Sequence, residues 1–286
     1  MKVISISGGL GNQLFQYAFY LYLKDNSGFD EIFLDFSFYE KQNKRDAVIR
    51  KFEPVRSADI KEQSLRKRIQ FSVIKFLIKI DFLKKFFTFF DGEKGLDEKV
   101  LLTKKTMLDG YWQSFKYAEN SKEYVREIFN FYEFENSLLE LKNEISTTNS
   151  VCLHIRRGDY VSEAHTNQVH GICSIEYYHK AIKKIEENSE NIKYVYVFSD
   201  DVSWVKDNLN LTLPTKVIDF RGKGVPDYAE MLLFSCGKHK VIANSTFSWW
   251  GAFLSERNGM VVSPKDWFAI KERNYQEIFI EGSIRL

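Results

Sequence analysis

The chain has 286 residues, of which 44% are hydrophobic, 16% aromatic and 28% charged. This composition excludes disordered and collagen-like chains, because there is enough apolar surface to bury in a core. The 41 Lys and Arg residues nearly balance 39 Asp and Glu, and the resulting net charge of +2 gives no reason to expect a nucleic-acid partner. We therefore expect a globular protein of one large or two smaller domains.

Short β-branched or aromatic runs alternate with helical patterns along the chain, which is typical of an α/β fold with parallel strands. The expected strands cover residues 3–7, 31–35, 151–155, 194–199, 216–219, 241–243 and 260–263. The expected helices cover residues 14–24, 175–187, 201–208, 227–236 and 247–255. A polar stretch at 146–150 separates a helix from a strand and predicts two domains, 1–149 and 150–286.

The sequence carries no sign of export or membrane insertion. Its three cysteines are an odd number without Cys-x-x-Cys spacing, which argues against a disulfide framework or a zinc site. The apolar run at the N-terminus is four residues long, too short for a signal peptide. The uncharged stretch 241–255 has 15 residues, whereas a membrane span needs about 20. We expect a cytoplasmic protein.

The segment 61–85 has a different character from the rest of the chain. It contains eight basic residues against Glu62 and Asp81, a local net charge of +6, and a Phe-rich run follows it. Two interpretations remain open. Arg66 to Phe90 forms a basic amphipathic surface that contacts a membrane, or it forms a surface helix whose Phe-rich face packs on its own domain.

Glycines follow the first expected strand in the run Gly8-Gly9-Leu10-Gly11-Asn12-Gln13. Such a loop lets backbone N–H groups approach an anion at the start of a helix, although it also suits a simple tight turn. It is neither a dinucleotide fingerprint, because Leu14 replaces the third glycine, nor a P-loop. Gly9, Gly11, Asn12 and Gln13 are the candidate ligand contacts here.

The run His154-Ile155-Arg156-Arg157-Gly158-Asp159-Tyr160 stands at the end of another expected strand. Side chains alternate along a strand, so His154 and Arg156 point to the same side. An arginine at a strand end is a good clamp for phosphate. The alternative is that Arg157 and Asp159 form a structural ion pair at a turn.

Two further polar runs follow expected strands. Asp200 and Asp201 lack the Asp-x-Asp spacing of many metal-dependent enzymes. Asp200 is a candidate acceptor for the N–H groups of guanine, while Asp201 also suits a helix N-cap.

The run Asn244-Ser245-Thr246-Phe247-Ser248-Trp249-Trp250-Gly251 places hydroxyls at the start of a helix, where phosphate oxygens find donors. Trp249 and Trp250 are expected in the core, and Cys152 is expected to be buried without a catalytic role.

Together these runs resemble the bacterial α-1,2-fucosyltransferases of glycosyltransferase family 11. The matching segments are 8–17, 110–114, 154–160, 170–173, 199–201 and 244–251. The resemblance implies a GT-B fold, in which two Rossmann-like α/β domains face a cleft. It also implies that the C-terminal half binds GDP-fucose, that the N-terminal half mainly shapes the acceptor site, and that no divalent metal or other cofactor is needed.

The implied reaction is inverting transfer of L-fucose from GDP-β-L-fucose to the 2-hydroxyl of a terminal β-galactoside, in surface glycan or O-antigen synthesis. By resemblance, Arg156 neutralises charge on the departing GDP and Asp159 is a second catalytic residue. The candidate donor-binding residues are Gly9, Gly11, Asn12, Gln13, His154, Arg157, Asp200, Asn244, Ser245, Thr246 and Ser248.

The general base is not identified by the motifs, and the conceivable groups are Asp35, Asp159, Glu163 and His165. The resemblance also leaves two other functions open: a fucosyltransferase of another acceptor linkage, and a non-catalytic GDP-sugar-binding module. The family resemblance implies a cytoplasmic enzyme, peripheral to the inner membrane if the segment 66–90 contacts lipid.

Overall fold

The computed structural model describes the chain except residues 42–45, 93, 130–133, 159–167, 170 and 274–275. The chain divides into two compact units, Met1–Phe131 with Tyr275–Ile278, and Tyr132–Asn274 with Phe279–Leu286. The predicted boundary at 149/150 therefore lies too late in the chain. Helix α8 (Asn136–Thr147) belongs to the second unit, where Glu144 accepts a hydrogen bond from Tyr196 Oη at 2.7 Å and forms an ion pair with Lys216.

The first unit is built on a parallel four-stranded sheet in the order β2-β1-β4-β3. Its strands are β1 (Lys2–Ser5), β2 (Ile32–Asp35), β3 (Thr88–Phe90) and β4 (Met107–Asp109). Val3 of β1 pairs with Phe33 on one side and with Met107 on the other. β1 and β4 are adjacent and parallel, so the loops that follow these two strands lie at the same edge of the sheet.

Helices and short 3-10 turns surround this sheet. The helices are α1 (Leu10–Asn26), α2 (Glu53–Arg56), α3 (Leu65–Leu77), α4 (Asp81–Phe87), α5 (Lys99–Leu102), α6 (Phe115–Ala118) and α7 (Lys122–Phe129). The 3-10 turns are η1 (Tyr39–Lys41), η2 (Val48–Lys51), η3 (Ile60–Glu62), η4 (Glu119–Ser121) and η6 (Gln276–Ile278). Glu277 of η6 accepts hydrogen bonds from Leu96 N at 2.6 Å and Ser114 Oγ at 3.0 Å, which fastens the late segment 275–278 to this unit.

The second unit is a doubly wound parallel sheet in the order β10-β9-β8-β5-β6-β7. Its strands are β5 (Ser150–Ile155), β6 (Tyr194–Ser199), β7 (Thr215–Ile218), β8 (His239–Val241), β9 (Val261–Ser263) and β10 (Ile284–Arg285). The chain moves from β5 to β7 in one direction, returns to β8 on the other side of β5, and continues outward to β10. The switch point therefore lies between β5 and β8, where open α/β sheets bind ligands beyond the carboxyl ends of their strands.

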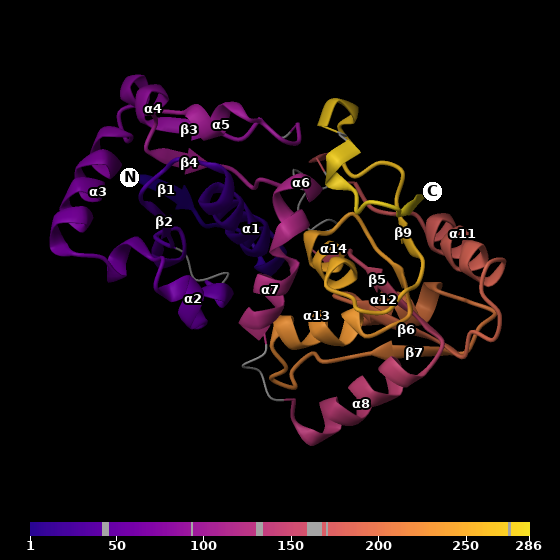
Figure 1. Ribbon diagram of the computed structural model, residues 1–286. Helices are drawn as coiled ribbons and strands as arrows, with labels where there is room; N and C mark the ends of the chain where they lie inside the picture. The colour runs from indigo at the N-terminus through magenta and orange to yellow at the C-terminus, as the bar shows by residue number, and fades with distance from the viewer. Residues whose placement is uncertain (42–45, 93, 130–133, 159–167, 170, 274–275) are drawn as a thin grey trace. The chain divides into compact units, whose positions relative to one another are not determined.

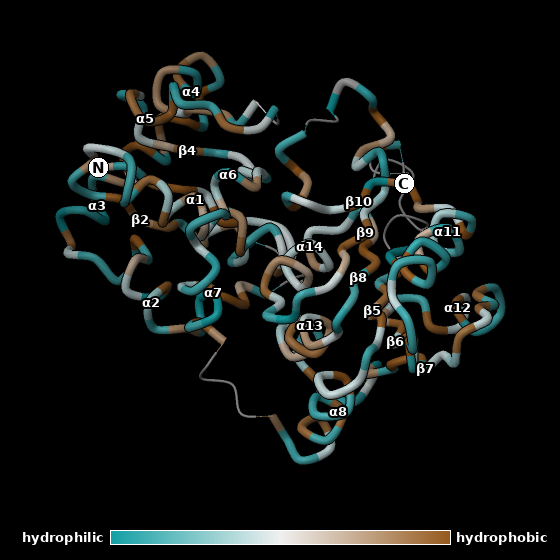
Figure 2. The backbone as a smooth tube through the Cα atoms, turned by 45° about the vertical axis from the view of Figure 1, so that its right-hand side comes forward, coloured by the Kyte–Doolittle hydropathy of each residue, from teal (hydrophilic) through white to brown (hydrophobic). Residues whose placement is uncertain are grey.

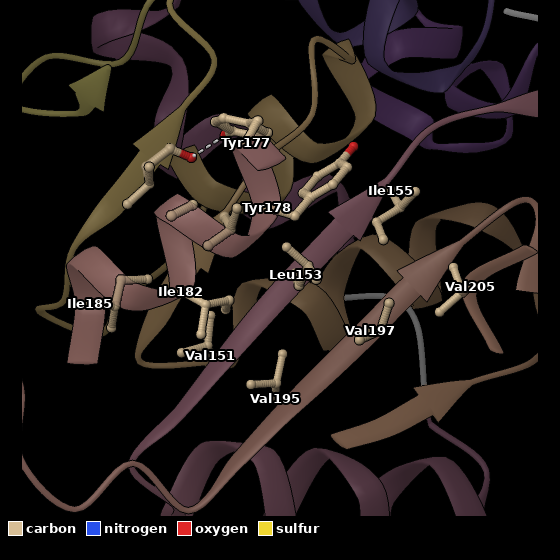
Figure 3. Packing of buried hydrophobic residues seen from close by; sticks show 13 residues of the cluster. Val151, Leu153, Ile155, Tyr177, Tyr178, Ile182, Ile185, Val195, Val197 and Val205 are labelled. Atoms are coloured by element: carbon tan, nitrogen blue, oxygen red, sulfur yellow. Dashed lines mark hydrogen bonds between the residues drawn. The ribbon is translucent and has the colours of Figure 1, made fainter. Parts of the chain in front are cut away.

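Helices cover both faces of this sheet (Figure 1). They are α11 (Ile175–Glu186), α12 (Val202–Asn208), α13 (Asp227–Ser235) and α14 (Thr246–Phe253), with a 3-10 turn, η5, at Lys271–Arg273. Figure 3 shows one face, where Leu153 of β5 and Val197 of β6 point toward Tyr178 and Ile182 of α11. Tyr177 Oη donates to Val262 O at 3.2 Å in the same cluster, which ties α11 to β9.

The opposite face carries the alternate residues of the same strands. Cys152 and His154 of β5 pair in register with Tyr196 and Phe198 of β6, and Phe234 of α13 packs on this face with its ring centroid 5.5 Å from that of Phe198. Strands buried on both faces are mainly apolar, and β5 and β9 accordingly appear largely brown in Figure 2. The prediction of an α/β fold with two Rossmann-like units of parallel strands is confirmed by these two sheets.

Within the described ranges, no helix combines the length and the apolar character needed to cross a bilayer.

Candidate functional site

Three of the sequence motifs meet at one edge of the second sheet. Arg156 follows β5, Asp200 follows β6, and Asn244 lies three residues after the end of β8. Because β6, β5 and β8 are adjacent and parallel, their carboxyl ends lie side by side. These motifs therefore share one sheet edge, and that edge includes the switch point of the unit.

Asp200 fixes the segment that follows β5. Its Oδ2 lies 2.9 Å from Arg156 Nη1, its Oδ1 accepts from Arg157 N at 2.9 Å, and Oδ2 also accepts from Gly158 N at 3.1 Å. A Cβ on residue 158 would lie 2.7 Å from Asp200 Oδ2, so a larger residue there would displace the carboxylate. The carboxylate therefore orients the Arg156 guanidinium, and its predicted contact with guanine stays a prediction.

Arg157 is engaged on the other side of this segment. Its guanidinium lies 3.9 Å from the centroid of the Trp204 ring, and its Nε lies 3.4 Å from Asp201 Oδ2. Asp201 Oδ1 accepts from Trp204 N at 3.1 Å, which confirms the expected N-cap of α12. The two arginines thus differ, since Arg157 packs against α12 while Arg156 lies at the strand edge with its side chain 31% exposed.

His154 is a buried, neutral histidine behind Arg156. Its side chain is enclosed by aromatic rings, with centroid distances of 5.3 Å to Phe247 and 6.1 Å to Phe234. Burial lowers the pKa of the imidazole to about 3, and the nearby positive charge of Arg156 acts in the same direction. Its buried Nδ1 has no hydrogen-bond partner among the described residues. A neutral imidazole at this edge can accept or donate one hydrogen bond without adding charge.

Glu230 of α13 is a site residue that the sequence analysis did not find. It precedes Phe234 by four residues, so the two side chains lie on one face of α13, and Phe234 contacts His154 and Phe198. Burial raises the pKa of Glu230 to about 7, with Asp227 and Asp200 acting in the same direction and Arg156 opposing them. The charges of Asp200 and Arg156 thus both act on the pKa of the Glu230 carboxyl.

Asn244 holds the turn after β8 together. Its Nδ2 donates to Trp267 O at 3.3 Å and to Gly171 O at 3.4 Å, while its Oδ1 accepts from Cys173 Sγ at 3.4 Å. The side chain is buried. Asn244 therefore joins the segment before α11 and the segment after β9 to the turn before α14.

The three hydroxyl residues of this turn have different surroundings. Ser248 is fully buried, and its Oγ donates within the turn to Ser245 O at 3.1 Å or Ala243 O at 3.3 Å. Ser245 is the N-cap of α14 without a side-chain capping bond, and Thr246 is the first helical residue and is partly exposed. Ser245 and Thr246 are thus placed beside the N–H groups of the first turn of α14, where anions bind.

In the first unit the glycine-rich run forms the start of a helix and not a loop before it. Helix α1 begins at Leu10 with Gly9 as its N-cap, so Gly11, Asn12 and Gln13 belong to its first turn. Only Gly8 has a positive φ, of 83°, and a Cβ there would lie 2.7 Å from Asn12 Nδ2. The expectation that the helix starts at residue 14 was wrong because glycines within a first turn read as loop in the sequence.

Side-chain amides fasten this helix start to its surroundings. Gln13 is fully buried, donates from Nε2 to Asp46 O at 2.8 Å and accepts from Ile49 N at 3.2 Å. Gln16, which the sequence analysis did not single out, donates from Nε2 to Gly110 O at 2.9 Å. Gln13 and Gln16 thus connect the start of α1 to the neighbouring loops. The predicted contact of Gln13 with a ligand stays a prediction.

Asn12 connects the loop after β1 with the loop after β4, since its Oδ1 accepts from Gln113 Nε2 at 2.9 Å. These two loops follow adjacent parallel strands of the first sheet. Asn12 is partly exposed, in contrast to Gln13.

Three of the four conceivable bases, Asp159, Glu163 and His165, lie outside the described residues. The fourth, Asp35 at the end of β2, forms an ion pair with Lys75 at 2.9 Å and accepts from Ser37 N at 3.1 Å. Trp249, Trp250 and Cys152 are fully buried as expected, and burial raises the pKa of the Cys152 thiol to about 12. No group of three His, Cys, Asp or Glu side chains suited to a metal ion occurs in the described part of the chain.

An arginine at the edge of a doubly wound parallel sheet, beside the N-terminus of a helix at the switch point, is typical of α/β proteins that bind phosphorylated ligands. The comparisons with known proteins give the particular family. Residues 1–283 match the model of glycosyl transferase family 11, and the chain belongs to this family.

Three relatives of this chain carry the names of glycosyltransferases. The O-antigen biosynthesis glycosyltransferase WbnK of Escherichia coli is 31% identical over 92% of this chain and 94% of its own length. The α-1,2-colitosyltransferase of Escherichia coli is 39% identical over 58% of this chain, and the chain spans 57% of that relative. The galactoside 2-α-L-fucosyltransferase of Caenorhabditis elegans is 30% identical over 56% of this chain and 45% of its own length.

Among solved structures, the fucosyltransferase NodZ from Bradyrhizobium aligns with 88% of this chain and 93% of its own at 12% identity, with a TM-score of 0.44. A mutant of Arabidopsis thaliana FUT1 in complex with GDP aligns with 91% of this chain and 70% of its own at 12% identity, with a TM-score of 0.48.

Proposed function

We propose that this family 11 glycosyltransferase transfers L-fucose from GDP-β-L-fucose to the 2-hydroxyl of a terminal β-galactoside, with inversion and without a divalent metal. The observation that carries the proposal is the Arg156–Asp200 pair at the switch point between β5 and β8, with the start of α14 following β8. The family membership and the names of two relatives, the α-1,2-colitosyltransferase and the galactoside 2-α-L-fucosyltransferase, support the α-1,2 linkage.

Glycosyl transfer passes through an oxocarbenium-like transition state, while negative charge builds up on the departing diphosphate. A guanidinium carries five N–H donors in a plane, and the contact of Nη1 with Asp200 fixes that plane. Arg156 is therefore the proposed group that stabilises the leaving diphosphate. Preorganised donors of this kind are worth about 10²–10³ in turnover.

The proposed donor site extends along the same edge. Ser245 and Thr246 offer hydroxyls and helix N–H groups to phosphate oxygens, and neutral His154 lies behind Arg156. Asp200, Arg157, Asn244 and Ser248 are proposed to act through the positions they hold. In the first unit, Gly9, Gly11, Asn12 and Gln13 remain proposed contacts. Asp159 remains the second proposed catalytic residue, and the base that deprotonates the acceptor hydroxyl is left unassigned.

The proposed setting is the cytoplasm, in the synthesis of a surface glycan. Cys152, Cys173 and Cys236 are all free, which suits a reducing compartment, and WbnK is named for O-antigen biosynthesis.

A second donor deserves a direct comparison, because the relative with 39% identity is a colitosyltransferase. Colitose is L-fucose without its 3-hydroxyl group. A site built to hydrogen-bond that hydroxyl rejects the deoxy sugar by about 10⁴-fold, whereas an apolar site rejects the extra hydroxyl by only about 10²-fold. The ratio of kcat/KM for the two donors therefore separates the two functions.

The test is to incubate the protein with lactose and EDTA and with either GDP-fucose or GDP-colitose, and to determine the mass and linkage of the product. A trisaccharide fucosylated at the galactose 2-hydroxyl in EDTA supports donor, linkage and metal independence together. Preferred transfer of colitose identifies GDP-colitose, and not GDP-fucose, as the donor. GDP release without trisaccharide means another acceptor linkage, and GDP binding without release means a non-catalytic binding module.

A further inference from the structure

The exposed apolar side chains of this protein are concentrated in one short segment. Eight of the fourteen large hydrophobic side chains that are exposed among the described residues lie between positions 65 and 90. They are Leu65, Ile69, Val73, Phe76, Ile80, Phe82, Phe86 and Phe90. Exposed apolar side chains that gather in one part of a protein mark interaction sites, whereas single exposed hydrophobic residues need no explanation.

Helix α3 has two apolar faces, and only one of them packs against the protein. Phe71 and Ile74 are buried in a cluster with Val3 of β1 and Met107 of β4. At 100° per residue, the exposed side chains Leu65, Ile69, Val73 and Phe76 span about 80° on the side of α3 opposite that buried stripe. Packing on its own domain therefore explains the inner face of α3 and leaves its outer face unexplained.

Cations surround the outer apolar side chains. Arg66, Arg68, Lys79 and Lys85 are exposed, and the Lys85 ammonium lies 5.0 Å and 5.2 Å from the ring centroids of Phe82 and Phe86. Lys84 lies 5.1 Å from the ring centroid of Phe90. The segment 61–85 carries a net charge of +6. Teal and brown accordingly alternate along α3 and α4 in Figure 2. We call these eight apolar side chains and the cations around them the α3–α4 face.

Two cations of the segment are directed to the sheet. Lys67 forms an ion pair with Glu31 at 2.7 Å, and Lys75 forms one with Asp35 at 2.9 Å. These pairs fasten α3 to the region of β2. The α3–α4 face is thus presented on an anchored helix.

Charge decides which occupant fits this face. A second copy related by a two-fold axis would place like-charged arginines and lysines against one another. A bilayer containing anionic lipid offers negative headgroups to the cations and an acyl boundary to the Phe, Ile and Leu side chains. We propose that the α3–α4 face binds the surface of an anionic phospholipid bilayer. The proposal rests on this face alone and is independent of the donor and acceptor proposed above.

The test is co-sedimentation of the full chain with phosphatidylcholine vesicles that contain either no or 30% phosphatidylglycerol. We expect binding only to the anionic vesicles, and release at high salt. Phe76→Ser with Phe82→Ser removes two exposed apolar anchors and lowers the affinity by about tenfold or more. Arg66→Gln with Arg68→Gln removes two cations and lowers it by about 25-fold.

Two matched controls change the same chemistry elsewhere. Tyr124→Ser with Leu139→Ser removes side chains that are 51% and 41% exposed on α7 and α8, and Lys180→Gln with Lys183→Gln removes two exposed cations from α11. Both controls are expected to bind like the parent protein. Thermal melting checks that each variant is folded. We expect all of them to fold, because every altered side chain is exposed.

Three outcomes overturn the proposal. The parent protein fails to sediment with anionic vesicles, the controls lose as much binding as the variants of the α3–α4 face, or light scattering in lipid-free solution shows a dimer that Phe76→Ser with Phe82→Ser abolishes. The last outcome assigns the face to a second copy of the chain.

Discussion

The substitution Asp200→Asn tests how the candidate site is held. The carboxylate accepts from Arg156 Nη1, Arg157 N and Gly158 N, and an amide of the same shape places an NH₂ group against at least one of these donors. Hydrogen bonds with a charged partner contribute about 1.5–3 kcal/mol. Because the Asp200 and Arg156 side chains are 24% and 31% exposed, solvent screens the pair. We therefore expect Asp200→Asn to lower the free energy of unfolding by about 1–2 kcal/mol.

The effect on turnover is expected to exceed the effect on stability. Displacing a positioned guanidinium by about 1 Å costs on the order of 10²-fold in rate. We therefore expect kcat with GDP-fucose to fall about 10²-fold, while the thermal midpoint falls by roughly 2–6 °C. Asp207→Asn, which alters an exposed carboxylate of α12, serves as the control and leaves both values unchanged.

A double-mutant cycle with Arg156→Lys refutes or supports the reasoning. If Asp200 acts by positioning Arg156, the double variant is no slower than Arg156→Lys alone. If the kcat losses of the two single variants multiply in the double variant, Asp200 does not act by positioning Arg156. A contact of Asp200 with guanine predicts something else again, because Asp200→Asn would then lose the preference for GDP over inosine diphosphate, which lacks the 2-amino group, with kcat little changed.

Three further predictions use the same protein preparations. Arg156→Lys keeps the positive charge but loses the planar fork, so kcat is expected to fall about 10²–10³-fold, and near-normal turnover would rule out its assigned role. Glu230 has a raised pKa of about 7 in the folded protein, so folding takes up a proton and the free energy of unfolding falls as pH rises from about 4.5 to 7. Glu230→Gln should therefore flatten the dependence of Tm on pH in that range. An unchanged slope of Tm against pH contradicts the raised pKa of Glu230. Gln16→Leu leaves Ser7 N–H and Gly110 C=O without their amide partner, and urea denaturation should show a loss of about 2–4 kcal/mol.

Strands formed by a recognisable apolar run were predictable from the sequence, whereas β3, β4 and β10 were not. The strand 194–199 was predicted with the bounds that β6 has, because it is a continuous apolar run that ends in polar residues. β3 and β4 have three residues each and β10 has two, too few for a periodic pattern. Their pairing depends on neighbours that are distant in the chain. The domain boundary was missed for the same reason, since the bonds of Glu144 place α8 in the second unit.

The candidate site shows a similar division. Motifs that directly follow strands were found, and the parallel sheet brings Arg156 and Asp200 together as expected. The sequence could not reveal which polar side chains form hydrogen bonds within the fold, as Asn244 and Gln13 do. Glu230 was missed because it follows no strand, although its spacing of four residues from Phe234 places it on the sheet-facing side of α13.

The path of the chain has a consequence for how the protein is made. The chain passes between the two units three times, and the segment 275–278 returns to the first unit after most of the second has been built. A ribosome that synthesises the chain from its N-terminus therefore completes the second sheet up to β9 before Glu277 can reach Ser114 and Leu96. The unit that is synthesised first therefore completes its hydrogen bonds at Leu96 and Ser114 only after the segment 275–278 has been made, so we expect the hydrogen-exchange protection of this region to develop late during synthesis.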